Sequence, residues 1–321
     1  MTSSFNVPIE DLGSSLAGPW RGPRQMLASQ EYDGHASIHD DATAQKLGFK
    51  GATIEGPTHF SQFAPLGEAI WGRRWFEDGC VSAHYRNAVF EGEEVRAFID
   101  KPADGAVQVA IRMEKRDGTE VLRGTAQVGA GGPPTALEAR LASLEPLKDP
   151  VILHDVPVGF KTGRQAVRMD PDRNMGALYP FSLAEKLKVI TEPSPLYHDA
   201  KVSPFGRAIV PMEMISVLVQ YTARDDRMPT RGPVVGLFAD QEIRLIKGPL
   251  LVGEDYEIDR EVVFLSGSRR TESLWVKTKV FKPGGQEVLA TMLLNSASMK
   301  ESYARYEAEH AALYGASATA H

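Results

Sequence analysis

The segment Ile38-His39-Asp40-Asp41-Ala42 returns as Leu196-Tyr197-His198-Asp199-Ala200 about 158 positions later along the chain. The first copy leads to Ile54-Glu55-Gly56, and the second leads to Ile209-Val210-Pro211. A repeat at about half the length of a chain indicates two copies of one domain, since solenoid repeats are much shorter.

Further blocks of the two halves match in the same order. The run Glu91–Val95 resembles Val252–Tyr256, and Asp117–Leu122 resembles Gly284–Leu289. The offset between matched blocks drifts between about 141 and 167 residues, as expected when duplicated domains differ in the lengths of their loops. The matching order therefore predicts a tandem duplication with insertions between the matched blocks.

The length of 321 residues predicts two domains of ordinary size, and a chain with 42% hydrophobic and 24% charged residues is typical of globular proteins. We expect an N-terminal domain over residues 1–132 and a C-terminal domain over 158–302. Between them, residues 133–157 begin in a Gly- and Pro-rich run and predict a linker. Residues 303–321 predict a C-terminal tail with a short helix.

Charge and cysteine content narrow the class of protein. The net charge is -6, and basic residues are scattered among acidic ones, so no positive stripe for nucleic acid is expected. The single cysteine, Cys80, excludes an internal disulfide framework and favours a cytoplasmic location. Neither an export signal nor an apolar run long enough to span a membrane is expected.

Each half places one helix ahead of several strands. Alternation of polar and apolar residues predicts strands between Val81 and Val128, with a hairpin at Asp117-Gly118, and again between Asp240 and Ala297. Helical spacing predicts helices over Thr58–Trp71 and Met212–Ala223, the latter apolar on nearly every side and therefore buried. The predicted fold class is α+β: a tandem double hotdog in which each long helix is wrapped by an antiparallel sheet. We expect the two sheets to join, with the helices on one face.

These features resemble the MaoC-like family of R-specific enoyl-CoA hydratases and dehydratases in its double-hotdog form. The resemblance is carried by His39-Asp40-Asp41-Ala42 leading to Gly48-Phe49 and Gly56, by the helix that follows, and by Gly92-Glu93-Glu94-Val95. It covers most of both halves. It implies an Asp and a His that act as general base and acid on an acyl thioester, and a helix N-terminus that binds the thioester oxygen.

The family motif reads Asp, any residue, Asn, Pro, an aliphatic residue and His. His39 fits the histidine, but Gly34 stands where the aspartate belongs, and Asp33 lies one position earlier. In the second half Glu192 stands for the aspartate and Tyr197 for the histidine. The resemblance therefore implies a catalytic first half, with His39 as acid or base and Asp33 as its partner, and a degenerate second half.

The third catalytic candidate is Gly56, which precedes Pro57 at the start of the first predicted helix. Hydration of an enoyl thioester needs fixed donors for the enolate oxygen, and a helix N-terminus favours negative charge. Because Pro57 has no N–H, either Gly56 or Thr58 must supply the donor.

Several other side chains are candidates for contact with substrate. Glu55 and His59 lie four residues apart across the helix start, and Glu213 is a carboxylate on a helix that we expect to be buried. The full set of substrate-binding candidates is Glu55, His59, Trp71, Tyr197 and Glu213. His35 and His39 lack a third ligand at metal-site spacing, so we expect no metal, and we expect no cofactor.

The leading hypothesis is a hydro-lyase acting on an enoyl or hydroxyacyl thioester, linked to CoA. The first alternative is a hotdog acyl-CoA thioesterase, in which Glu55 or Glu213 would carry the reaction. The second is a non-catalytic acyl-binding protein, because fold does not imply function. The expected partner is a small-molecule acyl thioester, and a homo-oligomer is compatible with this reading.

Overall fold

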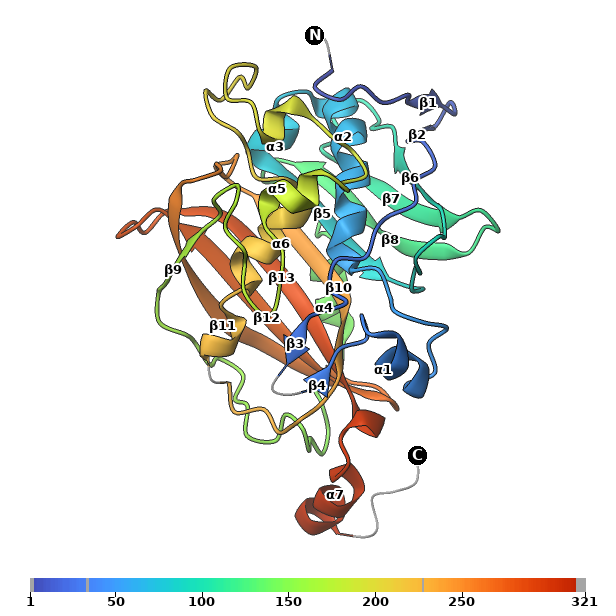
Figure 1. Cartoon of the computed structure of the whole chain (residues 1–321), viewed down its shortest axis with the longest axis vertical. Helices are drawn as coiled ribbons and strands as arrows, with labels where there is room; N and C mark the ends of the chain where they lie inside the picture. The colour runs from blue at the N-terminus through green and yellow to red at the C-terminus, as the bar shows by residue number, and fades with distance from the viewer. Residues whose placement is uncertain (1–2, 33–34, 227, 316–321) are drawn as a thin grey trace.

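The computed structural model describes residues 3–32, 35–226 and 228–315. Within these ranges eleven strands form one sheet in which the hydrogen-bonded neighbours run antiparallel (Figure 1). In sheet order the strands are β1 (Glu10–Asp11), β2 (Ser15–Ala17), β6 (Val95–Asp100), β7 (Gln108–Lys115), β8 (Glu120–Val128), β5 (Gly79–Tyr85), β10 (Gly236–Leu245), β13 (Val288–Met299), β12 (Thr271–Phe281), β11 (Asp255–Gly267) and β9 (Gln165–Arg168). A separate pair joins β3 (Glu31–Tyr32) to β4 (His35–Ala36).

The duplication is visible in the order of the strands. Outward from the centre, the first half runs β5, β8, β7, β6, β2, and the second half runs β10, β13, β12, β11, β9. The halves meet where β5 pairs with β10, with Val81 opposite Ile243. The predicted union of two sheets into one antiparallel sheet is therefore confirmed.

Alternation along the strands explains why one face of the sheet packs inward. In β7 the side chains of Val109, Ile111 and Met113 are buried, whereas Ala110 between them is exposed. The hairpin that leads to β8 turns at Gly118, whose φ of 83° lies in the left-handed region that favours glycine. Local sequence thus sets both the register and the turn.

One central helix lies in each half. In the first half η1 (Gly56–Phe63) continues into α2 (Ala64–Trp71), and in the second half α6 (Met212–Gln220) packs against η1. Every residue of α6 from Met212 to Val219 is buried, as its apolar sequence predicts. The remaining helices are α1 (Asp41–Lys46), α3 (Arg74–Asp78), α4 (Ala136–Ser143), α5 (Leu183–Leu187), η2 (Pro195–Tyr197), η3 (Ala223–Asp226), η4 (Lys300–Ser302) and α7 (Tyr306–Tyr314).

Helix α4 is a further helix, in addition to the two central helices that the sequence predicts. It lies in the segment predicted as a linker and contacts β5, β8 and β10. The backbone N–H of Leu137 donates to Ser82 Oγ, and the Thr135 hydroxyl at the helix N-cap contacts Glu242. Ser82 and Glu242 point away from the central helices, because strand side chains alternate between faces. The junction of the two halves is therefore covered on both sides.

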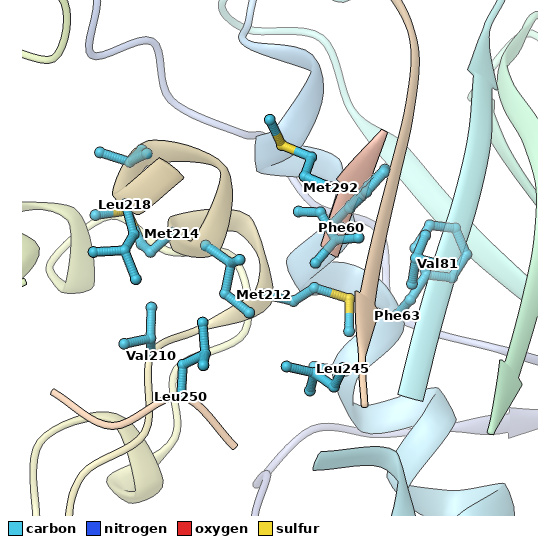
Figure 2. Close-up of a cluster of buried hydrophobic side chains, with 14 of the residues drawn as sticks. Phe60, Phe63, Val81, Val210, Met212, Met214, Leu218, Leu245, Leu250 and Met292 are labelled. Carbon is cyan, nitrogen blue, oxygen red and sulfur yellow. The ribbon is translucent and has the colours of Figure 1, made fainter. Parts of the chain in front are cut away.

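The central helices share one hydrophobic core. Figure 2 shows side chains from η1, α6 and the neighbouring strands in a single cluster, in which Met212 extends toward Phe63 and Leu245. The labelled members are Phe60, Phe63, Val81, Val210, Met212, Met214, Leu218, Leu245, Leu250 and Met292. The two halves are therefore packed together by shared apolar burial as well as by the sheet. In the described part of the chain, none of the helices has the length and apolar character needed to cross a membrane.

Candidate active site

A cavity of about 300 Å³ lies at the N-terminal end of η1. Its lining includes His39, Glu55, Gly56 and His59 from the first half and residues 236–239 at the start of β10 from the second half. Two of the three catalytic candidates and two of the five substrate-binding candidates thus meet in one space. Asp33, the remaining catalytic candidate, lies outside the described residues.

The backbone around His39 is held in place by its neighbours. The carbonyl of Ile38 accepts a hydrogen bond from the Thr53 N–H at 3.1 Å, and Asp40 caps α1 by accepting from the Thr43 N–H at 2.8 Å. Asp40 is a typical N-cap residue, and Asp41 in the first turn suits the helix dipole. His39 is therefore fixed between a strand-like contact and a helix start.

The ring of His39 is oriented by a hydrogen bond from Nδ1 to the Thr53 carbonyl oxygen, at 2.7 Å. A carbonyl only accepts, so Nδ1 carries the proton and the neutral ring keeps its lone pair on Nε2. Burial lowers the pKa of His39, while the Glu55 charge and the Thr53 carbonyl partly oppose this effect. At neutral pH the imidazole is therefore suited to accept a proton at Nε2.

Glu55 is the N-cap residue of η1 and is only 9% exposed. Its Oε1 accepts from the Met26 N–H and its Oε2 from the Thr58 hydroxyl, both at 3.3 Å. Its negative charge raises the pKa of His39. The structure therefore couples Glu55 to His39 electrostatically within the cavity.

Gly56 lies against an aromatic ring. A Cβ at this position would be 2.6 Å from Tyr85 Cζ, so only glycine fits without movement of the ring. The Thr58 N–H already donates to the Glu55 carbonyl at 3.1 Å, and Pro57 has no N–H. Of the two donors considered from the sequence, Gly56 is therefore the one that remains for a substrate oxygen at this helix N-terminus.

His59 is 2% exposed, and its Nδ1 has no hydrogen-bond partner among the described residues. Burial lowers the pKa of His59 to about 3, with further contributions from the positive charges of Lys186 and Lys115. The ring is therefore neutral at ordinary pH. It suits a polar lining role better than that of a cationic acid.

The other candidates lie away from this cavity. Trp71 stacks on Trp75 with ring centroids 5.6 Å apart at the end of α2. Glu213 is buried on α6, and neither it nor Trp71 belongs to the cavity lining. Tyr197 lines a separate apolar cavity of about 20 Å³ that residues of both halves enclose.

Backbone hydrogen bonds establish which residues of the two halves correspond. The Thr53 N–H donates to the Ile38 carbonyl, and the Ile209 N–H donates to the Leu196 carbonyl in the same way. Tyr197 thus corresponds to His39, as the sequence repeat indicates. The N-cap of α6 is Pro211, so Glu55 corresponds to a proline. The second half therefore lacks both polar groups that flank the first cavity.

The acid at the family's aspartate position in the second half is paired. Arg21 donates from Nε to Glu192 Oε1 at 2.8 Å and from Nη2 to Oε2 at 3.0 Å. The Glu192 side chain is 1% exposed, and burial raises its pKa while Arg21 opposes the rise. Glu192 therefore holds an arginine of the first half rather than lining a cavity.

Lys186 is a buried residue that the sequence analysis missed. It lies on α5, is 3% exposed, and donates from Nζ to Thr58 Oγ1 at 3.0 Å. Its Nζ lies 3.8 Å from Glu213 Oε1. The sequence signal near it is a capping box at Ser182 and Glu185, which marks a helix start but not a buried lysine.

No family model and no curated protein matches the chain. Among solved structures it resembles a putative MaoC domain protein dehydratase from Chloroflexus aurantiacus at 15% identity, with a TM-score of 0.51 over 87% of this chain and 88% of that chain. It also resembles RV0216, a conserved hypothetical protein from Mycobacterium tuberculosis with a double hotdog fold, at 13% identity and a TM-score of 0.52 over 91% and 96% of the two chains. These likenesses show the fold. The chain is a double hotdog, and the structures that share its fold include the MaoC-like one that the sequence resemblance predicted.

Proposed function

We propose that the chain is a hydro-lyase that adds water to, or removes it from, an acyl thioester in the cavity around His39. The observation that carries this proposal is the hydrogen bond from His39 Nδ1 to the Thr53 carbonyl, which leaves Nε2 as a base. A carboxylate, Glu55, and a helix N-terminus at Gly56 line the same cavity. A base, a charge partner and an oxyanion donor are the groups that this reaction requires.

In hydration, His39 Nε2 takes a proton from water while the water oxygen bonds to the β-carbon of the enoyl thioester. The electron pair of the double bond moves onto the thioester oxygen, where the Gly56 N–H stabilises the enolate. Glu55 stabilises the imidazolium that forms, consistent with its effect on the pKa of His39. The imidazolium then returns its proton to the α-carbon, and dehydration follows the same steps in reverse.

The size of the cavity suits the acyl part of such a substrate. Its volume of about 300 Å³ is at the low end of the roughly 300–1,000 Å³ of small-molecule sites. We therefore expect the acyl group to enter the cavity and the CoA or carrier part to remain outside it. Short acyl chains should be turned over faster than long ones.

The test is a panel of enoyl-CoA and hydroxyacyl-CoA substrates of increasing length, with loss or gain of the conjugated double bond followed by ultraviolet absorbance. His39→Gln should lower kcat by about 10²- to 10⁴-fold, the usual contribution of general acid–base catalysis. His198→Gln is the matched control, because His198 is exposed in the second copy of the motif. Equal rates for His39→Gln and the control would refute the site.

The identity of the carboxylate partner is a separate question. The sequence resemblance implies Asp33, whereas the cavity contains Glu55. Glu55→Gln and Asp33→Asn, assayed side by side, distinguish the two. We expect the larger loss of kcat from Glu55→Gln.

A thioesterase is the second candidate, because Glu55 at the helix start could activate water toward the thioester carbonyl. Release of free CoA thiol without any change in the double bond would favour it over the hydro-lyase. In that case Glu55→Gln would abolish activity while His39→Gln would retain it. Tight binding of acyl-CoA without turnover of any substrate would favour an acyl-binding protein.

A further inference from the structure

A series of buried hydrogen bonds leads from the second half to the Glu55 carboxylate in the cavity. Lys186 Nζ donates to Thr58 Oγ1 at 3.0 Å, and the Thr58 hydroxyl donates to Glu55 Oε2 at 3.3 Å. All three side chains are buried. This series of hydrogen bonds therefore connects α5 of the second half to the N-terminus of η1 in the first.

The chemistry of the three side chains determines which group donates and which accepts in each hydrogen bond. An ammonium group has three donors and no acceptor, so Thr58 Oγ1 must be the acceptor in its bond to Lys186. A hydroxyl has one proton, which is then free to be donated to Glu55. The lysine therefore sets the orientation of the hydroxyl, and the hydroxyl holds one oxygen of the carboxylate.

We propose that Lys186 is a positioning residue for Glu55, supplied by the second half to the cavity of the first. Lys186 does not line the cavity, so it acts through Thr58 rather than on substrate. This inference rests on the proposed role of Glu55 beside His39. It assigns to the second half a role in a cavity that is lined mainly by the first.

The position of Lys186 is built into α5. The Ser182 N–H donates to Glu185 Oε2 at 2.7 Å and Ser182 Oγ accepts from the Glu185 N–H at 3.3 Å, so a capping box starts the helix. Leu183, one turn before Lys186, is buried in the core. These contacts direct the ammonium group inward, although lysine is among the residues least often buried.

The charge of Lys186 is balanced by one neighbour. Glu213 Oε1 lies 3.8 Å from Nζ, and both oxygens of Glu213 lack hydrogen-bond partners among the described residues. Lys186 lowers the pKa of Glu213 and Glu55 raises it, while Glu213 in turn raises the pKa of Tyr197. Glu55 also raises the pKa of His39, and Lys186 and Lys115 lower that of His59. Burial raises the pKa of Glu213 to about 7, so Glu213→Gln imitates its protonated form.

The first test uses His39 as a reporter of where Glu55 lies. The charge of Glu55 raises the pKa of His39, so displacement of the carboxylate should lower the titration midpoint of the His39 ring, followed by NMR. Glu55→Gln defines the full effect. Thr58→Val and the double variant Lys186→Met with Glu213→Gln should move the midpoint toward that value. Thr58→Ser and Glu213→Gln alone should keep the wild-type midpoint.

The double variant Lys186→Met with Glu213→Gln is designed to fold. It removes both buried charges and replaces them with groups of similar volume, so no unpaired charge remains at the site. Relative to Glu213→Gln, the double variant should lower kcat by about 10- to 100-fold, as expected for a misplaced catalytic group, with KM little changed. A midpoint and a kcat equal to those of Glu213→Gln would overturn the role of Lys186.

The two proposals can fail separately. The NMR titration needs no substrate, so absence of turnover with every enoyl thioester would refute the reaction and leave the midpoints to decide on Lys186. Conversely, wild-type turnover that depends on His39, together with midpoints that do not respond to Lys186 or Thr58, would refute this inference alone.

Discussion

Replacing Glu213 with glutamine should stabilise the protein in a pH-dependent way. Glu213 is 2% exposed, and its nearest charge is the ammonium group of Lys186 at 3.8 Å, too long for a hydrogen bond. Burial raises the pKa of Glu213 from 4.5 to about 7, even with Lys186 in place. The carboxylate form is therefore destabilised in the folded protein relative to the unfolded chain.

The sign and size of the effect follow from proton linkage. Below pH 4.5 Glu213 is protonated in both the folded and the unfolded protein. The wild type then has its full stability, and the glutamine variant should be equally stable. As pH rises toward 7, the unfolded chain releases its proton first, and the wild type loses stability. Each unit of difference between the unfolded and folded pKa of Glu213 corresponds to about 1.4 kcal/mol. Above pH 7 the wild type has therefore lost roughly 3 kcal/mol of unfolding free energy.

The assay is urea unfolding of the wild type and Glu213→Gln, followed by circular dichroism, at several values between about pH 5 and about pH 8. The difference in the free energy of unfolding should grow with pH in favour of the variant and then level off. Glu145→Gln is the control, because Glu145 is exposed and its substitution should give a constant difference. A constant difference for Glu213→Gln as well would refute the reasoning.

Two further substitutions test contacts that position the site. Arg21→Met should cost about 3 kcal/mol of unfolding free energy in urea titrations, because it leaves the Glu192 carboxylate buried without its partner, and adding Glu192→Met should restore most of the loss. An undiminished stability of Arg21→Met would contradict the burial of that pair. Gly56→Ala should cost about 1–3 kcal/mol in the same assay, because the new Cβ would lie 2.6 Å from Tyr85 Cζ. A variant as stable as the wild type would show that the ring moves freely.

The fold could be predicted from the sequence because its signals are local and periodic. Alternation in β7, the turn at Gly118 and the apolar run of α6 each set an element by short-range rules, and the repeat indicated that the elements occur twice. Helix α4 was missed because its helical pattern is short, with Leu137 as its one buried residue. It packs on a sheet face formed by β5, β8 and β10, which is a tertiary property.

The candidate site could be predicted only in part. The motif predicts His39 and Gly56, which line one cavity, but it places the partner of His39 at Asp33, which lies outside the described residues. Sequence similarity aligned Ile54 with Ile209, whereas backbone hydrogen bonds align Thr53 with Ile209. That shift of one residue makes Glu55 the counterpart of a proline and reveals how far the two helix starts have diverged.

Lys186 shows why charged support for a site is difficult to read from one sequence. A lysine in a short capped helix normally faces water, and no spacing rule links residue 186 to residue 58. Its buried Nζ donates to Thr58 of the first half, and such a contact between distant residues is a tertiary property. Glu213 stands out in the sequence because a carboxylate interrupts an apolar helix, and the structure places its Oε1 3.8 Å from Lys186 Nζ.

The two halves have diverged in complementary ways. Two equal cavities would leave two voids beside one shared core, and each void would lose packing contacts. At the corresponding position of the second half, Tyr197 and Met212 line a cavity of only about 20 Å³. The polar groups of the second half then serve the first half, since Glu192 pairs with Arg21 and Lys186 reaches Thr58. Loss of a second cavity thus accompanies a gain of buried contacts across the junction, which ties the remaining cavity to the presence of both halves.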